Sequence, residues 1–141
     1  MLVKELGKGS FGSAYLSIEK TTGFVCVLKM IRKDSIGEFE ASSFLREIKI
    51  QLFLNHPHIP ALYGCFDDNE SLYLIMEALP SGNLRSRVNK KMPEKEVKIV
   101  ISQLVSALTY MHSRFVIHRD IKPENIFTFL VSSTALRIIS N

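Results

Sequence analysis

The segment His118–Asn125 combines residue types that suit the transfer of a phosphoryl group. Asp120 could accept or orient the proton of an attacking hydroxyl, and Lys122 could neutralise charge on the transferred group. Asn125 could ligate Mg²⁺ through its amide oxygen. His118 taken alone is more often a structural histidine than a base, and both interpretations stay open. The segment predicts a catalytic loop in which Asp120, Lys122 and Asn125 act and Asn125 holds metal.

A glycine pattern near the N-terminus suits a different part of the same chemistry. Gly7, Gly9 and Gly12 follow the spacing G-x-G-x-x-G. Glycines let a backbone approach phosphates closely and present N–H groups to them. A dinucleotide-binding loop would lead into a helix, whereas residues 14–18 have the pattern of a strand, so that class is excluded. A glycine-rich hairpin turn without a ligand remains an alternative from this pattern alone.

Lys29 is a charged residue inside an apolar strand, in the run Cys26-Val27-Leu28-Lys29. An unpaired buried ammonium is costly, so this position predicts a partner such as phosphate oxygens or a carboxylate. Glu47, on the helix that follows, could form an ion pair that holds the amine against the phosphates. The alternative is an edge lysine in solvent and an ordinary surface glutamate.

The elements that would position these residues are strands first and helices later. Apolar alternation and turn residues predict strands and a closing hairpin, and i, i+3/i+4 spacing predicts two amphipathic helices. The strands are expected at residues 2–6, 14–18, 24–31, 61–66 and 72–77, the helices at 38–54 and 94–113, and the hairpin at 126–139. On the first helix the apolar face would be Phe44, Leu45, Ile48 and Leu52. A composition shift near residue 80 predicts two parts, 1–79 and 80–141.

Composition limits the classes of partner. The net charge is +4, and Arg85, Arg87, Lys90 and Lys91 form the one basic cluster. A solvated helix face explains the cluster best, and docking of an acidic partner is the alternative. Aromatic residues do not alternate with these charges, so we expect no nucleic-acid partner.

Other features indicate an intracellular protein. The sequence lacks an apolar run long enough to cross a bilayer and a start typical of a secretory signal, so we expect no membrane association. Cys26 and Cys65 are expected to be reduced, buried thiols and not a disulfide. Cysteines and histidines show no spacing typical of metal ligands.

In order and spacing, these motifs resemble those of eukaryotic protein kinases: glycine loop, strand lysine, helix glutamate and catalytic loop. Lys122, two residues after Asp120, resembles serine/threonine kinases. A closer similarity is to the Aurora kinases, and it is carried by Leu6–Gly12, Arg46–Gln51, His56–Ile59, Leu62–Phe66, Leu72–Glu77 and Val116–Asn125.

The resemblance implies an α+β, protein kinase-like fold that is truncated. It would have a five-stranded antiparallel sheet with one helix, then the first helices and catalytic loop of the second lobe. The implied cofactors are ATP and Mg²⁺, and the implied substrate is a protein with Ser or Thr. The resemblance also implies an activator that docks on the first lobe. The implied location is the cytoplasm or nucleus, at the spindle or centrosome.

The same resemblance assigns residues to the nucleotide. Leu6, Ala14 and Val27 would close over adenine, Met76 would be the gatekeeper, and Phe127 would form the floor. Glu77 and Leu79 would offer backbone groups to the adenine edge. The remaining nucleotide-site residues implied by the family motifs are Gly7, Lys8, Gly9, Ser10, Phe11, Gly12, Lys29, Glu47 and Glu124.

The end of the chain departs from the family pattern. Ser140 stands where the family has a metal-binding aspartate, and Asn141 stands where it has phenylalanine. Later motifs are absent, so the apolar face of residues 94–113 is expected to be exposed. We therefore expect a truncated serine/threonine kinase sequence, without measurable transfer by these 141 residues alone. The alternatives are an inactive kinase-like module that binds nucleotide or a partner, and an unrelated α+β domain.

Overall fold

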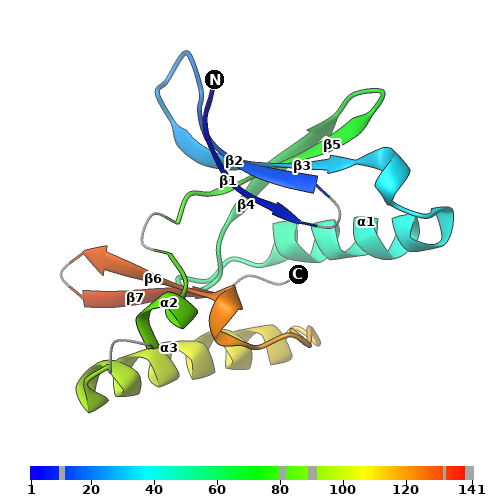
Figure 1. Cartoon of the computed structure of the whole chain (residues 1–141). Coiled ribbons are helices and arrows are strands. Elements are labelled where there is room, and N and C mark those ends of the chain that lie inside the picture. Colours follow the sequence, from blue (N-terminus) through cyan, green and yellow to red (C-terminus); the bar gives the residue numbers. More distant parts are fainter. Residues whose placement is uncertain (10–11, 80–81, 89–91, 132, 139–141) are drawn as a thin grey trace. The chain divides into compact units, whose positions relative to one another are not determined.

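A computed structural model describes residues 1–9, 12–79, 82–88, 92–131 and 133–138 (Figure 1). The chain forms two compact units. The first, here called the sheet unit, contains Met1–Phe53 and Ala61–Ala78. The second, here called the helical unit, contains Leu54–Pro60 and Leu79–Asn141.

The sheet unit is built on one five-stranded antiparallel sheet with strand order β1-β2-β3-β5-β4. This confirms the expected kinase-like α+β sheet. Turn residues separate strands rich in β-branched and aromatic side chains, as the sequence pattern predicts. The strands are β1 (Leu2–Gly9), β2 (Gly12–Ile18), β3 (Val25–Arg32), β4 (Leu62–Asp67) and β5 (Ser71–Glu77).

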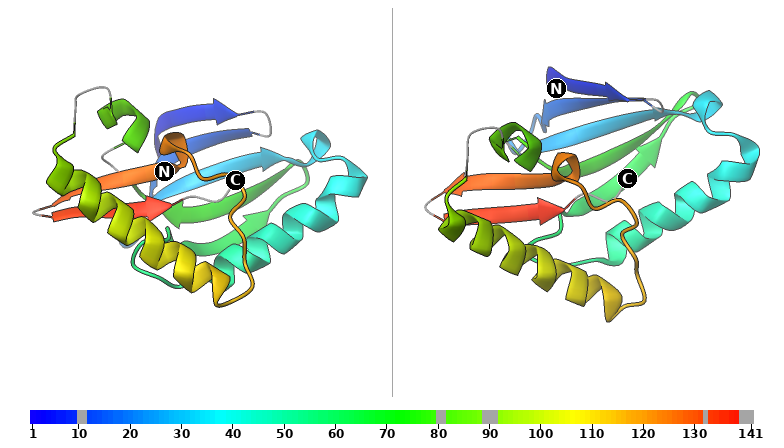
Figure 2. Two further views of the ribbon diagram at one scale, coloured as in Figure 1. Left: turned by 90° about the horizontal axis from the view of Figure 1, so that it is seen from below. Right: turned by 60° about the horizontal axis from the view of Figure 1, so that its bottom comes forward.

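Helix α1 (Glu38–Phe53) follows the short 3-10 turn η1 (Lys33–Ser35) and contacts β4 (Figure 2). Ile48 of α1 is buried in a cluster with Ile31, Leu62 and Leu74, one residue from each of three strands. The apolar face of α1 is narrower than expected, because Leu45 and Leu52 are exposed. Only the side of the helix that carries Ile48 and Phe44 packs against this cluster.

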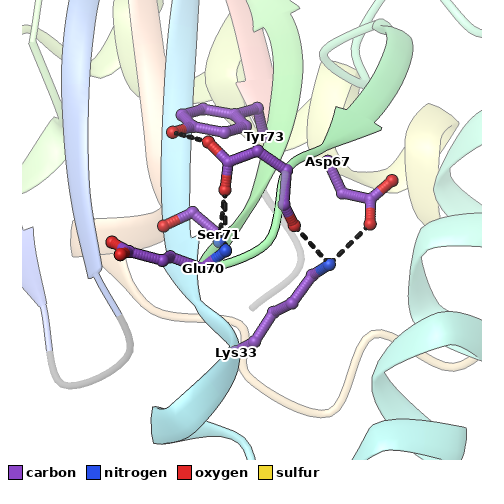
Figure 3. A network of polar contacts seen from close by, with 6 residues as sticks. Lys33, Asp67, Glu70, Ser71 and Tyr73 are labelled. Carbon is purple, nitrogen blue, oxygen red and sulfur yellow. Dashed lines mark hydrogen bonds and ion pairs between the residues drawn. The ribbon is translucent and has the colours of Figure 1, made fainter.

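A polar network connects η1, which directly follows β3, to the β4–β5 turn (Figure 3). The Lys33 ammonium donates to the Asp67 carboxylate at 2.6 Å and to the Asp68 carbonyl at 2.5 Å. Asp68 accepts from the backbone N–H of Ser71 at 2.8 Å and from the Tyr73 hydroxyl at 2.9 Å. The network therefore fixes the turn from which β5 starts.

The helical unit pairs a long helix with a hairpin. Helix α3 (Glu94–His112) packs against β7 of that hairpin and buries Val100, Ala107 and Met111. Its elements are α2 (Leu84–Val88), α3, the 3-10 turn η2 (Pro123–Asn125), β6 (Ile126–Val131) and β7 (Ser133–Ile138). The expected exposed apolar face is present on α3 and consists of Val97, Ile101 and Val105.

The segment Leu54–Pro60 belongs to the helical unit, although its sequence position places it within the predicted first part, 1–79. The Asn55 N–H donates to the Tyr110 hydroxyl at 2.8 Å, and His56 Nε2 lies 3.2 Å from the Ser106 hydroxyl. These contacts tie the segment to α3. The functional division at residues 79 and 80 stays a prediction.

The two cysteines differ in exposure. Cys26 is buried and free as expected, but the prediction for Cys65 is wrong, because this free thiol is exposed on the edge strand β4. Of the basic cluster, Arg85 lies on α2, while the side chain of Arg87 and residues 90–91 lie outside the described residues. In the part of the chain that is described, no helix is long and apolar enough to span a bilayer.

Candidate nucleotide-binding and catalytic site

The glycine pattern spans the hairpin between β1 and β2. Gly9 pairs with Gly12 at the end of the ladder, and Lys8 pairs with Ser13. A Cβ atom on Gly7 would meet nothing within 4 Å, whereas one on Gly12 would lie 1.9 Å from the Met30 carbonyl oxygen. The glycine at Gly12 is therefore required by the sheet. The one at Gly7 leaves open space that a ligand could approach.

Two further residues of the loop, Ser10 and Phe11, lie outside the described residues. Their assignment to the nucleotide stays a prediction.

Strand register places the expected adenine and phosphate residues on one face of the sheet. Ala14 pairs with Lys29, which pairs with Leu74 on the next strand. Val27 pairs with Met76. Directly opposite residues share a face, and so do residues two apart in one strand. Leu74 and Met76 belong to the α1 cluster or pack against it, so this face is also the one that covers α1.

Lys29 is partly buried on this face, and its electrostatics follow from that position. Desolvation lowers the pKa of its amine below the usual 10.5, and the Glu47 carboxylate partly opposes the shift. Glu47 lies on α1 with an exposed side chain. Within the described residues, the Glu47 carboxylate favours the charged form of the Lys29 amine, but the two side chains have no ion pair of 4.0 Å or less. The predicted direct ion pair is therefore not present in this structure.

Other residues assigned to adenine include Leu6, Glu77 and Leu79, and they differ in position. Leu6 is in β1 between two register positions where the ladder is irregular, and it is 52% exposed. Glu77 ends β5, where its backbone N–H donates to the Ala61 carbonyl at 2.9 Å. Its carboxylate accepts from the Ala61 N–H at 3.1 Å. Leu79 is half-buried and belongs to the helical unit. The sequence did not predict the contact made by the Glu77 side chain.

The helical unit brings together the three residues predicted to be catalytic. The Lys122 ammonium lies 2.8 Å from Asp120 Oδ2. The Asn125 amide donates to the same Oδ2 at 2.8 Å and to the Asp120 carbonyl at 2.9 Å. Asn125 is 7% exposed, whereas Asp120 is half-buried. Because one nitrogen makes both bonds, the Asn125 side chain is fixed relative to the Asp120 carboxylate.

Backbone geometry around Asp120 explains how this arrangement forms. Arg119 has φ 68°, a left-handed conformation that reverses the chain just before the aspartate. His118 is buried, and its Nδ1 accepts the Asp120 N–H at 3.2 Å. His118 therefore has a structural role in this loop. The η2 turn then starts at Pro123, where its fixed φ suits a first-turn position.

The metal role of Asn125 stays a prediction, and the hydrogen bonds of its amide bear on which atom would serve. Since Nδ2 is turned to Asp120, Oδ1 is the atom that would face Mg²⁺, and oxygen is the donor that this ion prefers. The Asn125 amide oxygen fits such an ion in chemistry. Among the described residues there is no cluster of three or more His, Cys, Asp or Glu side chains that could hold a metal.

Glu124 and Phe127 connect the catalytic loop to its neighbours. Arg85 of α2 lies 3.5 Å from the Glu124 carboxylate, a contact that the sequence did not predict. Phe127, the predicted floor of the adenine site, is half-buried and forms an isolated bridge with Asn83. Ser140 and Asn141, the departures from the family pattern, lie outside the described residues.

Comparison with known proteins identifies the family. The family model "Protein kinase domain" matches residues 1–139. An Aurora kinase of Saccharomyces cerevisiae is 41% identical over 89% of this chain and 35% of its own length. One of Schizosaccharomyces pombe is 44% identical over 87% of this chain and 36% of its own. Aurora kinase B of Mus musculus is 43% identical over 87% of this chain and 36% of its own.

The chain thus spans about a third of the length of the curated relatives it matches. The match to the family model covers nearly every residue, including the glycine loop, Lys29 and the catalytic loop. Together with the five-stranded sheet, it shows that the chain belongs to the protein kinase domain family.

Proposed function

We propose that this chain carries the nucleotide-binding and catalytic-loop parts of an ATP-dependent protein serine/threonine kinase. The observation that carries the proposal is the convergence of Lys122 and Asn125 on one oxygen of Asp120. A carboxylate held in this way has a fixed direction in which to accept or orient a hydroxyl proton.

The proposed roles of the catalytic-loop residues follow from their charges and hydrogen-bonding groups. Asp120 would orient the Ser or Thr hydroxyl of a protein substrate. Lys122 would place a positive charge beside the transferred phosphoryl group, where negative charge accumulates. Asn125 would hold Mg²⁺ through Oδ1, and the bound ion would supply charge neutralisation at the phosphates.

The sheet unit would bind the nucleotide. Ala14, Val27 and Met76 are apolar residues on the same sheet face as Lys29, so one face offers an apolar surface for adenine and an amine for phosphate. The open space at Gly7 lets the phosphates approach the backbone. Leu6 and Glu77 are the further residues of this unit in the proposal. In the helical unit, Leu79, Glu124 and Phe127 are assigned to the nucleotide by the kinase resemblance alone.

The proposal is tested with purified chain, radiolabelled ATP, Mg²⁺ and a mixture of Ser/Thr-containing peptides. Phosphate transfer that disappears in Asp120→Asn would support it. Asp120→Asn is the variant to use because it keeps an acceptor oxygen for Asn125 while removing the charge. Melting curves with and without Mg·ATP test nucleotide binding separately, since a ligand that binds only the folded state raises the melting temperature.

A second candidate function is favoured by Ser140, which has no charge to bind metal where the family has an aspartate. In that case the chain binds nucleotide or a protein partner without catalysis. Stabilisation by Mg·ATP together with no transfer would support this candidate, and transfer abolished by Asp120→Asn would refute it. An activator docked on the sheet unit, and a place at the spindle or centrosome, remain proposals from the Aurora similarity.

A further inference from the structure

Two hydrogen bonds connect Glu77 and Ala61. The Glu77 N–H donates to the Ala61 carbonyl at 2.9 Å, and the Ala61 N–H donates to Glu77 Oε2 at 3.1 Å. Ala61 precedes β4, whose ladder with β5 begins at the pair Leu62 and Met76. The carboxylate therefore extends the pairing of the two strands by one residue, at a point where the ladder itself does not satisfy the Ala61 N–H.

The two hydrogen bonds lie where the chain enters and leaves the sheet unit. Ala61 is the residue at which the chain re-enters the sheet unit, and Ala78, next to Glu77, is the residue at which it leaves. The two bonds thus fasten the entry and exit segments of the unit to each other. They also fix the backbone at the end of β5, because both bonds end on Glu77.

We propose that the Glu77 carboxylate is a positioning residue for the nucleotide. It holds the end of β5 in place through Ala61, so that the peptide groups following Met76 keep the orientation in which they would contact adenine. This inference rests on the proposed nucleotide binding and goes beyond it, since it assigns the role to the side chain and not to the backbone. The side chain acts through Ala61 and does not itself touch the nucleotide.

The test compares Glu77→Ala with Glu77→Gln in the whole chain. Glutamine keeps an oxygen that can accept the Ala61 N–H, whereas alanine leaves that N–H without its partner. Amide hydrogen exchange at Ala61, measured without nucleotide, is expected to accelerate roughly three- to tenfold in Glu77→Ala and to change little in Glu77→Gln. The Kd for Mg·ATP is expected to weaken by a similar factor in Glu77→Ala only.

The matched control is Glu70→Ala, which removes the same charge from the turn at the other end of β5 (Figure 3). It should leave both the Ala61 exchange rate and the Kd unchanged. Equal weakening of the Kd in Glu77→Ala and Glu77→Gln would overturn the proposal, because charge and not the bond to Ala61 would then matter. Faster exchange in Glu77→Ala with an unchanged Kd would also overturn it.

These outcomes separate the inference from the function on which it rests. If the unchanged chain does not bind Mg·ATP, the proposed nucleotide binding fails, and the positioning role fails with it. The exchange rate at Ala61 still reports whether the Glu77 carboxylate holds the strand end.

Discussion

The α-carbon of Gly12 lies so close to β3 that a Cβ atom there would be 1.9 Å from the Met30 carbonyl oxygen. A backbone oxygen cannot move away without disturbing the β2–β3 ladder. We therefore expect Gly12→Ala to destabilise the chain by about 2 kcal/mol or more, measured by urea denaturation.

Gly7→Ala should behave in the opposite way, because a Cβ atom at Gly7 meets nothing within 4 Å. Its stability should stay within about 0.5 kcal/mol of the unchanged chain, while its Kd for Mg·ATP weakens. If Gly7→Ala bound Mg·ATP normally, the phosphates would not approach the backbone at this glycine.

The different surroundings of Gly7 and Gly12 could not be predicted from the sequence. The motif treats Gly7 and Gly12 alike, since both match the same pattern. Only the strand register shows that Gly12 faces a carbonyl of β3 while Gly7 faces open space. The strands and helices themselves could be predicted, because apolar alternation and helical spacing are local properties of the chain.

Contacts that cross from one element to another could not be predicted in this way. The bond between Glu77 and Ala61 depends on where the β4–β5 ladder begins. The exposure of Cys65 depends on β4 lying at the sheet edge. Residues close in sequence were easier: Asp120, Lys122 and Asn125 were predicted to act together, and the loop does bring them together.

Lys29→Met is expected to raise the melting temperature at pH 7. Burial lowers the pKa of the Lys29 amine, so the folded chain holds this proton less tightly than the unfolded chain does. The charged amine therefore reduces stability at neutral pH, and this effect fades as pH rises towards 10.5, the usual value. The increase in melting temperature caused by methionine should become smaller over the same pH range, and thermal melts at several pH values would measure it.

Lys4→Met, on the exposed β1, is the control for Lys29→Met and should have little effect on the melting temperature. A lower melting temperature for Lys29→Met at pH 7 would mean that the coupling to Glu47 outweighs desolvation. Binding of Mg·ATP should weaken in Lys29→Met in either case, if the amine contacts phosphate.

His56 should make the chain sensitive to mild acid. Its Nδ1 accepts the His58 N–H at 3.1 Å, which requires the ring to be unprotonated at that nitrogen. Desolvation, followed by the charges of His58, Arg137 and Arg114, lowers the pKa of His56 below 6.5. The ring also packs on Tyr110, with centroids 4.9 Å apart. Stability is therefore expected to fall as pH decreases below about 6.5 and to level off below the folded-state pKa.

The test for His56 is the slope of the melting temperature between pH 7 and pH 5. His56→Asn keeps an acceptor for the His58 N–H but does not titrate, so its slope should be smaller. His112→Asn makes the same substitution at the exposed end of α3, away from the His58 N–H, and is the matched control. Equal slopes for all three proteins would contradict the assignment to His56.

Asn125→Asp should destabilise the catalytic loop. Asn125 Nδ2 donates two hydrogen bonds to Asp120, and an ionised carboxylate at position 125 has no proton to donate in their place. The new negative charge would also lie beside the negative charge of Asp120. We expect a cost of about 2–3 kcal/mol at pH 7 and a smaller one near pH 4, where a protonated carboxyl can donate again. Asn83→Asp is the control, since the Asn83 oxygen accepts the Ser86 N–H and an aspartate can do the same.

Phe115 offers a stabilising substitution. It is 97% exposed and has φ 59° in the turn that ends α3. In this turn the Phe115 N–H donates to the His112 carbonyl at 2.9 Å, and the Val116 N–H donates to the Met111 carbonyl at 3.0 Å. A left-handed residue at this position is usually glycine, because a Cβ atom is strained there. Phe115→Gly should therefore stabilise the chain by about 1 kcal/mol in urea denaturation.

Phe115→Ala separates this backbone effect from removal of an exposed aromatic ring. Alanine keeps the Cβ atom and hence the strain, so its stability should stay close to that of the unchanged chain. If alanine stabilised the chain as much as glycine did, the gain would come from removing the ring and not from relaxing the backbone. The two variants together therefore measure how much strain the chain reversal before the catalytic loop contains.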